Sequence, residues 1–297
     1  MSLSKLAIVE SPLQLLCAYE ALGNSKGNHI ILRLTGVGKN DQQTQNLAKQ
    51  LKLRCFVINA PVGQLPVLFM ALWRSRSLLC QRYHAVYLGS YFSRFIRVIG
   101  QFARGPIFLL DDGMATILAQ KKMACKKKPY SLFTFFDVVP LESQIRIRHS
   151  FRRVRSAFTI SENSGSYFIG QPLVEEGLMS LLQYEDIVSQ ALNDCGGMLT
   201  YVVHRAESDL RVDKIKNIFG ISVLYPNSNI ELEFLLNSQA PKKIYSCCST
   251  ALITLKILFP ESMVISYIPI TLMENTTQTH LMDIVSTIQT LGEVRFI

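Results

Sequence analysis

The chain has 297 residues, of which 48% are hydrophobic and 18% are charged. This balance excludes an intrinsically disordered protein and predicts a packed chain, long enough for two domains that each bury a core. The formal net charge of +9 suits an anionic partner, such as a nucleotide, a phosphate-bearing glycolipid, a membrane surface or a nucleic acid. Charge alone does not choose among these.

Cysteine use and the N-terminus indicate a reducing compartment. The seven cysteines are scattered and odd in number, a poor framework for disulfides, and Cys247 and Cys248 have no second pair at zinc-ligand spacing. The N-terminus lacks the features of a signal peptide, and no apolar run reaches the ~18 residues of a transmembrane helix. We therefore expect a cytoplasmic protein, with peripheral contact at the inner face of the cytoplasmic membrane as an open alternative.

In chain order, the first half alternates short apolar runs with amphipathic stretches. Ser11 suits the N-cap of the first helix, and Pro12 suits its first position because no amide hydrogen is needed there. The alternation predicts a doubly wound parallel sheet. Strands are predicted at residues 6–9, 28–34, 54–58, 84–88 and 105–110, and helices at residues 12–22, 41–51, 65–79 and 95–102.

A stretch rich in Ser, Asn and Gly follows at residues 156–170, and we place a domain boundary there, near residue 165. The predicted domains are residues 1–165 and 166–297. The second domain repeats the alternation and predicts a shorter α/β unit. Its strands are predicted at residues 199–203, 221–225, 243–246 and 263–268, and its helices at residues 185–195, 212–219, 230–238, 249–258 and 278–291.

Two strand ends carry polar, titratable residues. His204 ends the predicted strand 199–203, and Asp111 and Asp112 directly follow strand 105–110. Open α/β sheets bind ligands at the carboxyl ends of their strands. One of two adjacent acids can act as a general base or bind a metal, but an Asp-Gly pair is also an ordinary turn. A single histidine in this position is also often a structural hydrogen-bonding group.

Two helix starts in the second domain could contact a nucleotide. Ser249 and Thr250 lie where unpaired amide groups bind phosphate readily, although Ser249 could be a simple N-cap. Glu231 and Glu233 could accept hydrogen bonds from ribose hydroxyls, although acids also favour a helix start. The absence of P-loop, G-x-G-x-x-G and G-x-S-x-G motifs argues against a P-loop NTPase, a dinucleotide-binding protein and a serine hydrolase.

Two segments concentrate positive charge. Residues 121–128 hold five lysines, and residues 146–155 form a second basic cluster. Each is either a solvated surface or a contact with phosphate or an anionic membrane. A non-catalytic anion- or nucleic-acid-binding protein is therefore an alternative function. Because neither segment interleaves aromatic residues over a basic face, we expect no nucleic-acid partner.

Taken in order, these features resemble the bacterial sialyltransferases, most closely the lipooligosaccharide type of glycosyltransferase family 52. The family pattern is His-Pro, whereas Arg205 follows the histidine here, and Cys248 stands where a first serine is common. The resemblance covers most of the chain, and the order of the short motifs makes it specific. The matching segments are residues 10–16, Asp111-Asp112-Gly113, Gly170-Gln171-Pro172, His204, residues 229–235 and residues 248–252.

This resemblance implies a GT-B fold, in which two Rossmann-like, doubly wound parallel-sheet domains face a cleft. It implies an N-terminal domain on the acceptor side and a C-terminal domain that binds the nucleotide sugar. The donor would be CMP-sialic acid, transferred with inversion to a cell-surface glycan or lipooligosaccharide, with no cofactor and no metal. Another CMP-nonulosonic acid or another nucleotide sugar is the alternative donor. Acceptor identity, linkage and oligomeric state are left open, a homodimer included.

The resemblance also implies roles for individual residues. Asp111 or Asp112 would be the general base, with Glu175 and Glu176 as alternatives. His204 would donate a hydrogen bond to the CMP phosphate as it leaves.

Ser249 and Thr250 would hold the same phosphate, and Glu233, with Glu231 as second choice, would bind the cytidine ribose. Arg205 could add a phosphate or carboxylate contact. The remaining predicted substrate contacts are Gly170, Pro172, Ser11 and Gln14.

Overall fold

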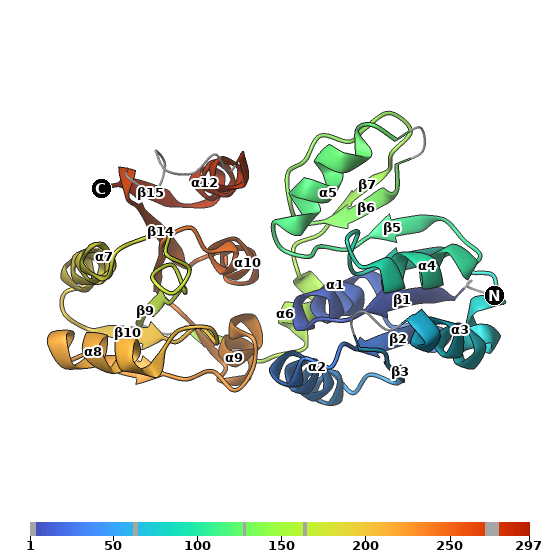
Figure 1. Cartoon of the computed structure of the whole chain (residues 1–297), viewed down its shortest axis with the longest axis horizontal. Coiled ribbons are helices and arrows are strands. Elements are labelled where there is room, and N and C mark those ends of the chain that lie inside the picture. Colours follow the sequence, from blue (N-terminus) through green and yellow to red (C-terminus); the bar gives the residue numbers. More distant parts are fainter. Residues whose placement is uncertain (1–3, 62–64, 127–128, 163–164, 271–278) are drawn as a thin grey trace. The chain divides into compact units, whose positions relative to one another are not determined.

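The computed structural model describes residues 4–61, 65–126, 129–162, 165–270 and 279–297. The chain forms two compact units, Met1–Ala157 (unit 1) and Phe158–Ile297 (unit 2), shown in Figure 1. Each unit is an α/β layer structure built on a parallel sheet, which confirms the predicted fold class. The sequence predicts the boundary near residue 165, and in the structure the first unit ends at Ala157 and the second begins at Phe158.

The sheet of unit 1 has the strand order β3-β2-β1-β4-β5-β6-β7, and every pairing in it is parallel. Its central strands are covered on both faces and are therefore almost wholly apolar. The strands are β1 (Lys5–Val9), β2 (His29–Leu34), β3 (Cys55–Asn59), β4 (Ala85–Leu88), β5 (Ile107–Leu109), β6 (Ser131–Thr134) and β7 (Arg146–Arg148).

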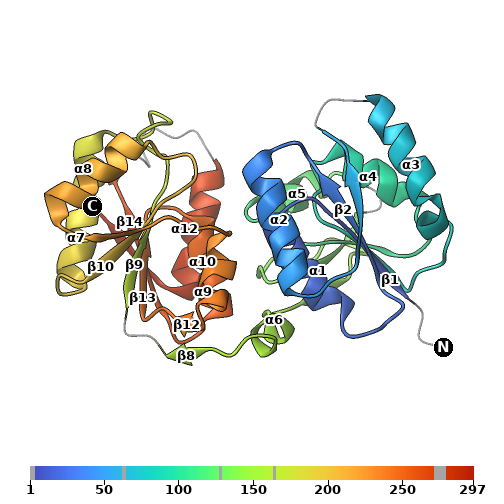
Figure 2. The ribbon, with the colours of Figure 1, turned by 90° about the horizontal axis from the view of Figure 1, so that it is seen from below.

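Helices cover both faces of this sheet. Figure 2 shows α1 and α2 on one face and α3 and α4 on the other. Helix α1 begins as predicted, because Ser11 is its N-cap and accepts a hydrogen bond from the Gln14 amide at 3.4 Å, with Pro12 in the first turn. The helices are α1 (Pro12–Leu22), α2 (Gly38–Gln50), α3 (Leu65–Leu79), α4 (Arg94–Phe102), α5 (Ala115–Met123) and α6 (Arg152–Ser156).

The sheet of unit 2 has the order β11-β10-β9-β13-β14-β15 and is also parallel throughout. A separate small sheet pairs β12 with β8. The strands are β8 (Ser161–Glu162), β9 (Ser166–Ile169), β10 (Leu199–Val202), β11 (Ser222–Leu224), β12 (Gln239–Ala240), β13 (Lys243–Ser246), β14 (Met263–Ile268) and β15 (Glu293–Phe296).

In unit 2, α7 and α8 lie on one face of the sheet and α9, α10 and α12 on the other (Figures 1 and 2). Its strand order reverses between β9 and β13, just as the order of unit 1 reverses between β1 and β4. Such a reversal is the switch point at which open α/β sheets bind ligands. The helices are α7 (Leu181–Asp194), α8 (Asp209–Phe219), α9 (Ile230–Leu236), α10 (Thr250–Leu258) and α12 (Thr279–Leu291).

The sequence analysis does not predict α5, α6, β6, β8, β9, β12 or β15, and the largest omission is β9, a central strand of the unit 2 sheet. Strand β6 is short, and β15 alternates charged and apolar residues because it is a half-exposed edge strand. Within the residues that the structure describes, no helix combines the length and apolar character needed to cross a membrane.

Candidate functional site

Three chain segments leave the carboxyl edge of the unit 2 sheet from neighbouring strands, of which β9 and β13 flank its switch point. Gly170 follows β9, His204 follows β10 after one residue, and Cys247 follows β13. Strand β9 lies between the other two, and neighbouring strands are about 4.8 Å apart. The histidine loop and the start of α10 are therefore separated by two strand spacings, roughly 10 Å, within reach of a single nucleotide phosphate and its neighbouring sugar.

His204 is half-buried, and its ring has a defined hydrogen-bonding state. Nδ1 accepts the Ala206 amide at 3.3 Å, so the neutral ring carries its proton on Nε2. Burial lowers the pKa of His204 below 6.5, the nearby Arg205 charge lowers it further, and Glu175 opposes both effects. His204 is thus neutral at pH 7, with an Nε2–H that makes no hydrogen bond to the described residues.

The His204 loop is held by Glu207, a residue that the sequence analysis does not identify. The Glu207 side chain is fully buried, and its Oε2 accepts the His204 amide at 2.6 Å. Its Oε1 accepts hydrogen bonds from the Tyr201 hydroxyl and from Arg211. Burial raises the pKa of Glu207, and these hydrogen bonds oppose the rise. In the family pattern, a proline would restrict the backbone after the histidine. Here the Glu207 carboxylate restricts the backbone at the histidine itself, through the His204 amide.

Gly170 has a packing reason to be glycine. A Cβ at this position would lie 2.4 Å from Glu207 Oε2 and 2.8 Å from the Tyr201 hydroxyl, too close for either contact. The backbone of Gly170 therefore closes over the carboxylate that holds the histidine loop. Pro172 accepts the Glu176 amide through its carbonyl at 2.9 Å and belongs to the turn that follows.

Gln171 joins the end of β9 to the start of α10. Its Oε1 accepts the Ser246 hydroxyl at 3.2 Å, and its Nε2 lies 4.0 Å from Cys248 Sγ. Its amide donates to the Tyr184 hydroxyl at 3.0 Å. The three strand ends are therefore held together by side-chain contacts as well as by the sheet.

Ser249 is the N-cap of α10, because its hydroxyl accepts the Ala251 amide at 3.3 Å. Thr250 is the first residue of the helix, and its hydroxyl makes no hydrogen bond to the described part of the chain. The remaining amides of this first turn form the positive end of the helix dipole, which favours an anion. Capping is thus observed for Ser249, and phosphate contact by Thr250 stays a prediction.

The two predicted ribose-binding acids are both engaged within unit 2. Glu231 is 7% exposed, and its oxygens accept the Thr254 hydroxyl at 2.5 Å and the Asn229 amide group at 2.8 Å, which ties α9 to α10. Glu233 is half-buried, and its Oε2 accepts two backbone amides of the loop before α9 at 3.2 Å. Of the two, Glu233 is the more exposed.

Glu175 and Glu176 lie in the turn after β9. Glu175 Oε1 accepts the Ser208 amide at 2.8 Å and Arg211 Nε at 2.9 Å. Burial raises the pKa of Glu175, but these hydrogen bonds lower it by more, so its pKa lies below the usual value. A carboxylate held in its ionised form in this way is a weak base. Glu176 and Arg205 are both exposed.

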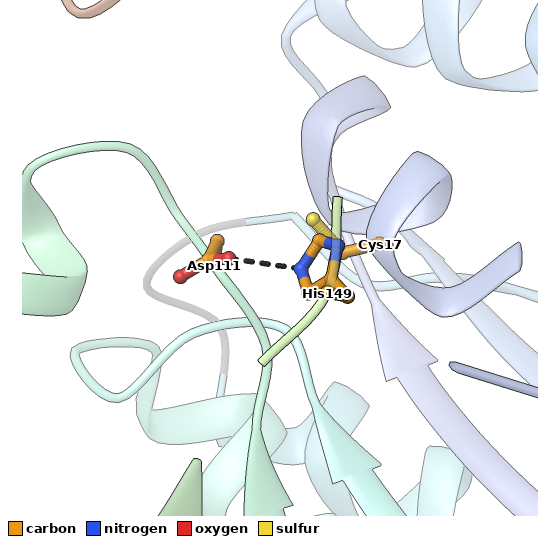
Figure 3. Close-up of side chains that lie close together, drawn as sticks. All are labelled: Cys17, Asp111 and His149. Carbon is orange, nitrogen blue, oxygen red and sulfur yellow. Dashed lines mark hydrogen bonds and ion pairs between the residues drawn. The ribbon is translucent and has the colours of Figure 1, made fainter. Parts of the chain in front are cut away.

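In unit 1, Asp111 follows β5 with one residue between them and is fully buried. Its Oδ1 accepts the Thr134 hydroxyl at 2.5 Å, and its Oδ2 lies 2.8 Å from the Phe135 amide and 3.1 Å from His149 Nε2 (Figure 3). A carboxylate with no exposed surface has no access to an acceptor hydroxyl in this structure. Asp111 therefore anchors β5 to β6 and to the segment after β7.

Figure 3 also shows Cys17 beside this pair, and the ligand atoms of Cys17, Asp111 and His149 lie within 4.8 Å of one another. The His149 ring stacks on Phe133 at 4.4 Å, and its Nδ1 is buried with no hydrogen-bond partner. Zn²⁺ uses these ligand types, and a tetrahedral site would need a fourth ligand. Among the described residues, this is the group that could hold a metal ion.

Asp112 lies in a different environment from its neighbour. Its Oδ1 accepts the side-chain amide of Gln14 at 2.8 Å. Burial raises the pKa of Asp112, and hydrogen bonds from Gln14 and Ser90 partly oppose the rise. Asp112 is therefore more basic than a free aspartate, which suits a general base.

The predicted substrate contacts Ser11 and Gln14 have structural roles in unit 1. Ser11 caps α1. Gln14 is 2% exposed, accepts the Glu10 amide through Oε1 at 2.9 Å and holds Asp112 through Nε2. A Cβ at Gly89 would lie 2.2 Å from Gln14 Oε1, so the end of β4 is also shaped around this side chain.

No protein-family model and no curated protein sequence matches the chain. Solved structures do match it over both units. The E. coli heptosyltransferase WaaC with ADP matches with a TM-score of 0.54 and 11% identity, over 99% of this chain and 93% of the other. The UDP-GlcNAc 2-epimerase of Methanocaldococcus jannaschii matches with a TM-score of 0.56 and 12% identity, over 100% and 89%. S. aureus MnaA with UDP matches with a TM-score of 0.52 and 8% identity, over 89% and 79%.

Identities this low establish the fold alone. The fold of the chain is that of the GT-B glycosyltransferases, with two parallel-sheet α/β domains. The WaaC structure contains ADP, and the MnaA structure contains UDP. The comparisons do not identify a sialyltransferase.

Proposed function

We propose that the chain is an inverting glycosyltransferase that transfers sialic acid from CMP-sialic acid to a cell-surface glycan or lipooligosaccharide acceptor. The observation that carries the proposal is the neutral His204 ring, whose Nε2–H makes no hydrogen bond to the described residues and which lies one strand from the switch point, on the same sheet edge as the start of α10. Its sequence counterpart is the ordered set of motifs that resembles the bacterial sialyltransferases. Unit 2 would bind the donor and unit 1 the acceptor.

The donor phosphate would lie between His204 and the first turn of α10. Negative charge builds on this phosphate as the bond to sialic acid breaks. His204 Nε2–H, the Thr250 hydroxyl and the first amides of α10 would donate to it. Because these donors are fixed in place, they stabilise the transition state more than the ground state. CMP is a good leaving group, so a metal is not essential to this scheme.

Glu207 would act as a positioning residue for His204. It holds the His204 amide and is itself held by Tyr201 and Arg211. A buried carboxylate with several fixed donors is rigid, so the imidazole is presented with little conformational freedom. Arg205, beside the histidine, would add a contact to the phosphate or to the sialic acid carboxylate.

Asp112 would be the general base that takes the proton of the acceptor hydroxyl. Its raised pKa increases its affinity for that proton, whereas the lowered pKa of Glu175 decreases it. Gln14 would hold the Asp112 carboxylate in place. Glu233 is the candidate for the cytidine ribose because it is more exposed than Glu231.

A donor-hydrolysis panel tests the proposal. Purified protein is incubated with CMP-sialic acid, a second CMP-nonulosonic acid, ADP-heptose and UDP-GlcNAc, and the released nucleotide is measured. We expect release of CMP from CMP-sialic acid, loss of that release in His204→Ala, and normal release in His84→Ala, a change at an exposed histidine in unit 1.

Release of UDP or ADP alone would keep the fold and the site but replace the donor. Arg205 in place of the family proline makes this second donor class the alternative to test. If folded protein releases no nucleotide from any of the four donors and binds no CMP, the proposed activity is wrong.

A further inference from the structure

Helix α3 exposes large apolar side chains on one face. Phe69 is 75% exposed, Met70 61% and Trp73 68%, and with Arg74 they line a shallow hollow on the surface of unit 1. Soluble proteins rarely leave such side chains in one contiguous patch without a partner. The opposite face of the helix packs into the core of unit 1 through small and aliphatic residues, which include Ala71.

Helix α3 belongs to a long stretch of sequence that contains basic residues and no acidic residue. Residues 42–110 contain nine Lys and Arg residues and no Asp or Glu. Arg74 and Arg76 are exposed on α3 itself, and the Arg76 guanidinium lies 4.0 Å above the Trp73 ring. A surface of this kind combines apolar insertion with attraction to anions.

We propose that α3 docks unit 1 on an anionic lipid bilayer. Phe69, Met70 and Trp73 would enter the boundary between headgroups and acyl chains, and Arg74 and Arg76 would contact lipid phosphates. Helices that lie in the plane of a membrane combine an apolar face bearing Trp and Phe with Lys and Arg beside it, and tryptophan favours the interface. The proposal concerns a surface away from the nucleotide site, so it does not rest on the identity of the donor.

Charge favours a bilayer over a second copy of the chain. In a contact between two α3 helices, residues 42–110 would offer no acid to pair with Arg74 and Arg76 of the other copy. In an anionic membrane, each such arginine gains from the surface potential.

The second basic cluster of the sequence is less available for this role. Arg146 and Arg148 both lie against Asp137, at 3.0 Å and 3.7 Å. Arg153 stacks on Tyr19 at 3.7 Å and bonds to the carbonyl of the same residue. Of the lysine segment, residues 127 and 128 lie outside the described residues.

The test uses the intrinsic fluorescence of Trp73, which is the only tryptophan of the chain. Full-length protein is titrated with phosphatidylglycerol–phosphatidylcholine vesicles and with pure phosphatidylcholine vesicles. We expect a blue shift of the emission with the anionic vesicles, quenching by lipids brominated on their acyl chains, and weakening of both at high salt. Pure phosphatidylcholine is expected to give a much smaller change.

Two test variants and one control distinguish the contribution of charge to membrane binding from the contribution of apolar insertion. Arg74→Glu/Arg76→Glu should weaken partitioning into anionic vesicles by more than about tenfold. Lys39→Glu/Lys49→Glu makes the same change in net charge at exposed positions of α2 and should weaken it far less. Phe69→Ser/Met70→Ser keeps the tryptophan and should abolish the quenching by brominated lipids.

An unchanged Trp73 emission with anionic vesicles would overturn the proposal, and so would equal weakening by the α2 and α3 charge variants. A blue shift that depends on protein concentration without lipid, with a dimer in light scattering, would assign α3 to self-association instead. Nucleotide release in the donor panel is measured without membranes, so its outcome is independent of these results.

Discussion

The two units share one strand order but fill their carboxyl edges differently. In unit 1, the switch point between β1 and β4 is closed by a buried ion pair, in which Arg33 Nη1 lies 2.8 Å from Glu10 Oε2, with the Ser93 hydroxyl on the same carboxylate at 3.0 Å. At the carboxyl edge of unit 2, His204 Nε2 and the Thr250 hydroxyl have no partners among the described residues. This difference between the two edges is why we propose the donor site in unit 2.

The two acids of unit 1 show the same contrast at a smaller scale. Asp111 is fully buried and both of its oxygens accept hydrogen bonds, whereas Asp112 is only partly satisfied and has a raised pKa. Neighbouring residues of one motif therefore lie in different environments, and of the two we propose catalysis for Asp112 alone.

The largest effect is expected from Asp112→Asn. Loss of a general base should lower sialyl transfer by about 10²–10⁴-fold. Because burial raises the folded-state pKa of Asp112, its stabilising contribution is present at low pH and is lost as the pH rises through that pKa. The neutral Asn should therefore leave the thermal midpoint at pH 7 unchanged or higher. Steady-state transfer rates and thermal melts measure both; retained transfer would contradict the assignment.

Asp111→Asn should lower the stability of the protein without changing its affinity for CMP. An amide at this position sets an NH₂ group against donors such as the Phe135 amide and the Thr134 hydroxyl. The free energy of unfolding should fall by about 1–3 kcal/mol. CMP affinity of the folded protein should stay unchanged because unit 2 is untouched. Urea unfolding measures the first effect, and full stability in this variant would mean that Asp111 is not the anchor described.

Gly170→Ala should disturb the His204 loop indirectly, through Glu207. The added Cβ would displace the Glu207 carboxylate, and overpacking of this kind costs about 1–3 kcal/mol. We expect weaker CMP binding together with a lower thermal midpoint. Gly38→Ala is the matched control, because no atom lies within 4 Å of its new Cβ, and it should bind CMP normally. Identical behaviour of the two variants would remove Gly170 from the site.

The smallest effect concerns pH. Burial lowers the folded-state pKa of His204 below its unfolded value of 6.5, so folding favours the neutral ring. The stabilising contribution of this ring is complete above the unfolded pKa and is lost as the pH falls through the folded pKa. As the pH falls from 7.5 to 5, the wild type should therefore lose more unfolding free energy than His204→Ala does. A shift in the opposite direction would show that His204 is stabilised as a cation.

Much of the fold can be predicted from the sequence because its signals are local. The Ser11–Pro12 start of α1 and the Ser249 cap of α10 depend on neighbouring residues only, and both are observed. The apolar runs of β1 and β4 reflect burial on both faces. Strand β15 is not predicted because its alternation of charged and apolar residues extends over only four residues, the shortest run that indicates a strand, and only the structure shows that it pairs with β14.

The contacts of the site residues could not be predicted, because they join distant residues. Asp111 meets His149 across 38 positions, and Gln14 meets Asp112 across 98. Glu207 lies three residues after His204, but its role depends on Tyr201, Arg211 and the absence of a side chain at Gly170. The sequence indicates candidate residues, and the fold shows which of them are buried in hydrogen bonds and which have groups without a partner among the described residues.

The placement of the donor phosphate is tested by calorimetric titration of wild-type protein and of His204→Ala with CMP, UDP and ADP. We expect CMP to bind the wild type in preference to UDP and ADP. We also expect His204→Ala, although folded, to lose at least about tenfold in CMP affinity, the effect of one hydrogen bond to a charged group. Equal CMP affinity in the two proteins, or no CMP binding by the wild type, would contradict the placement of the donor phosphate at the carboxyl edge of unit 2.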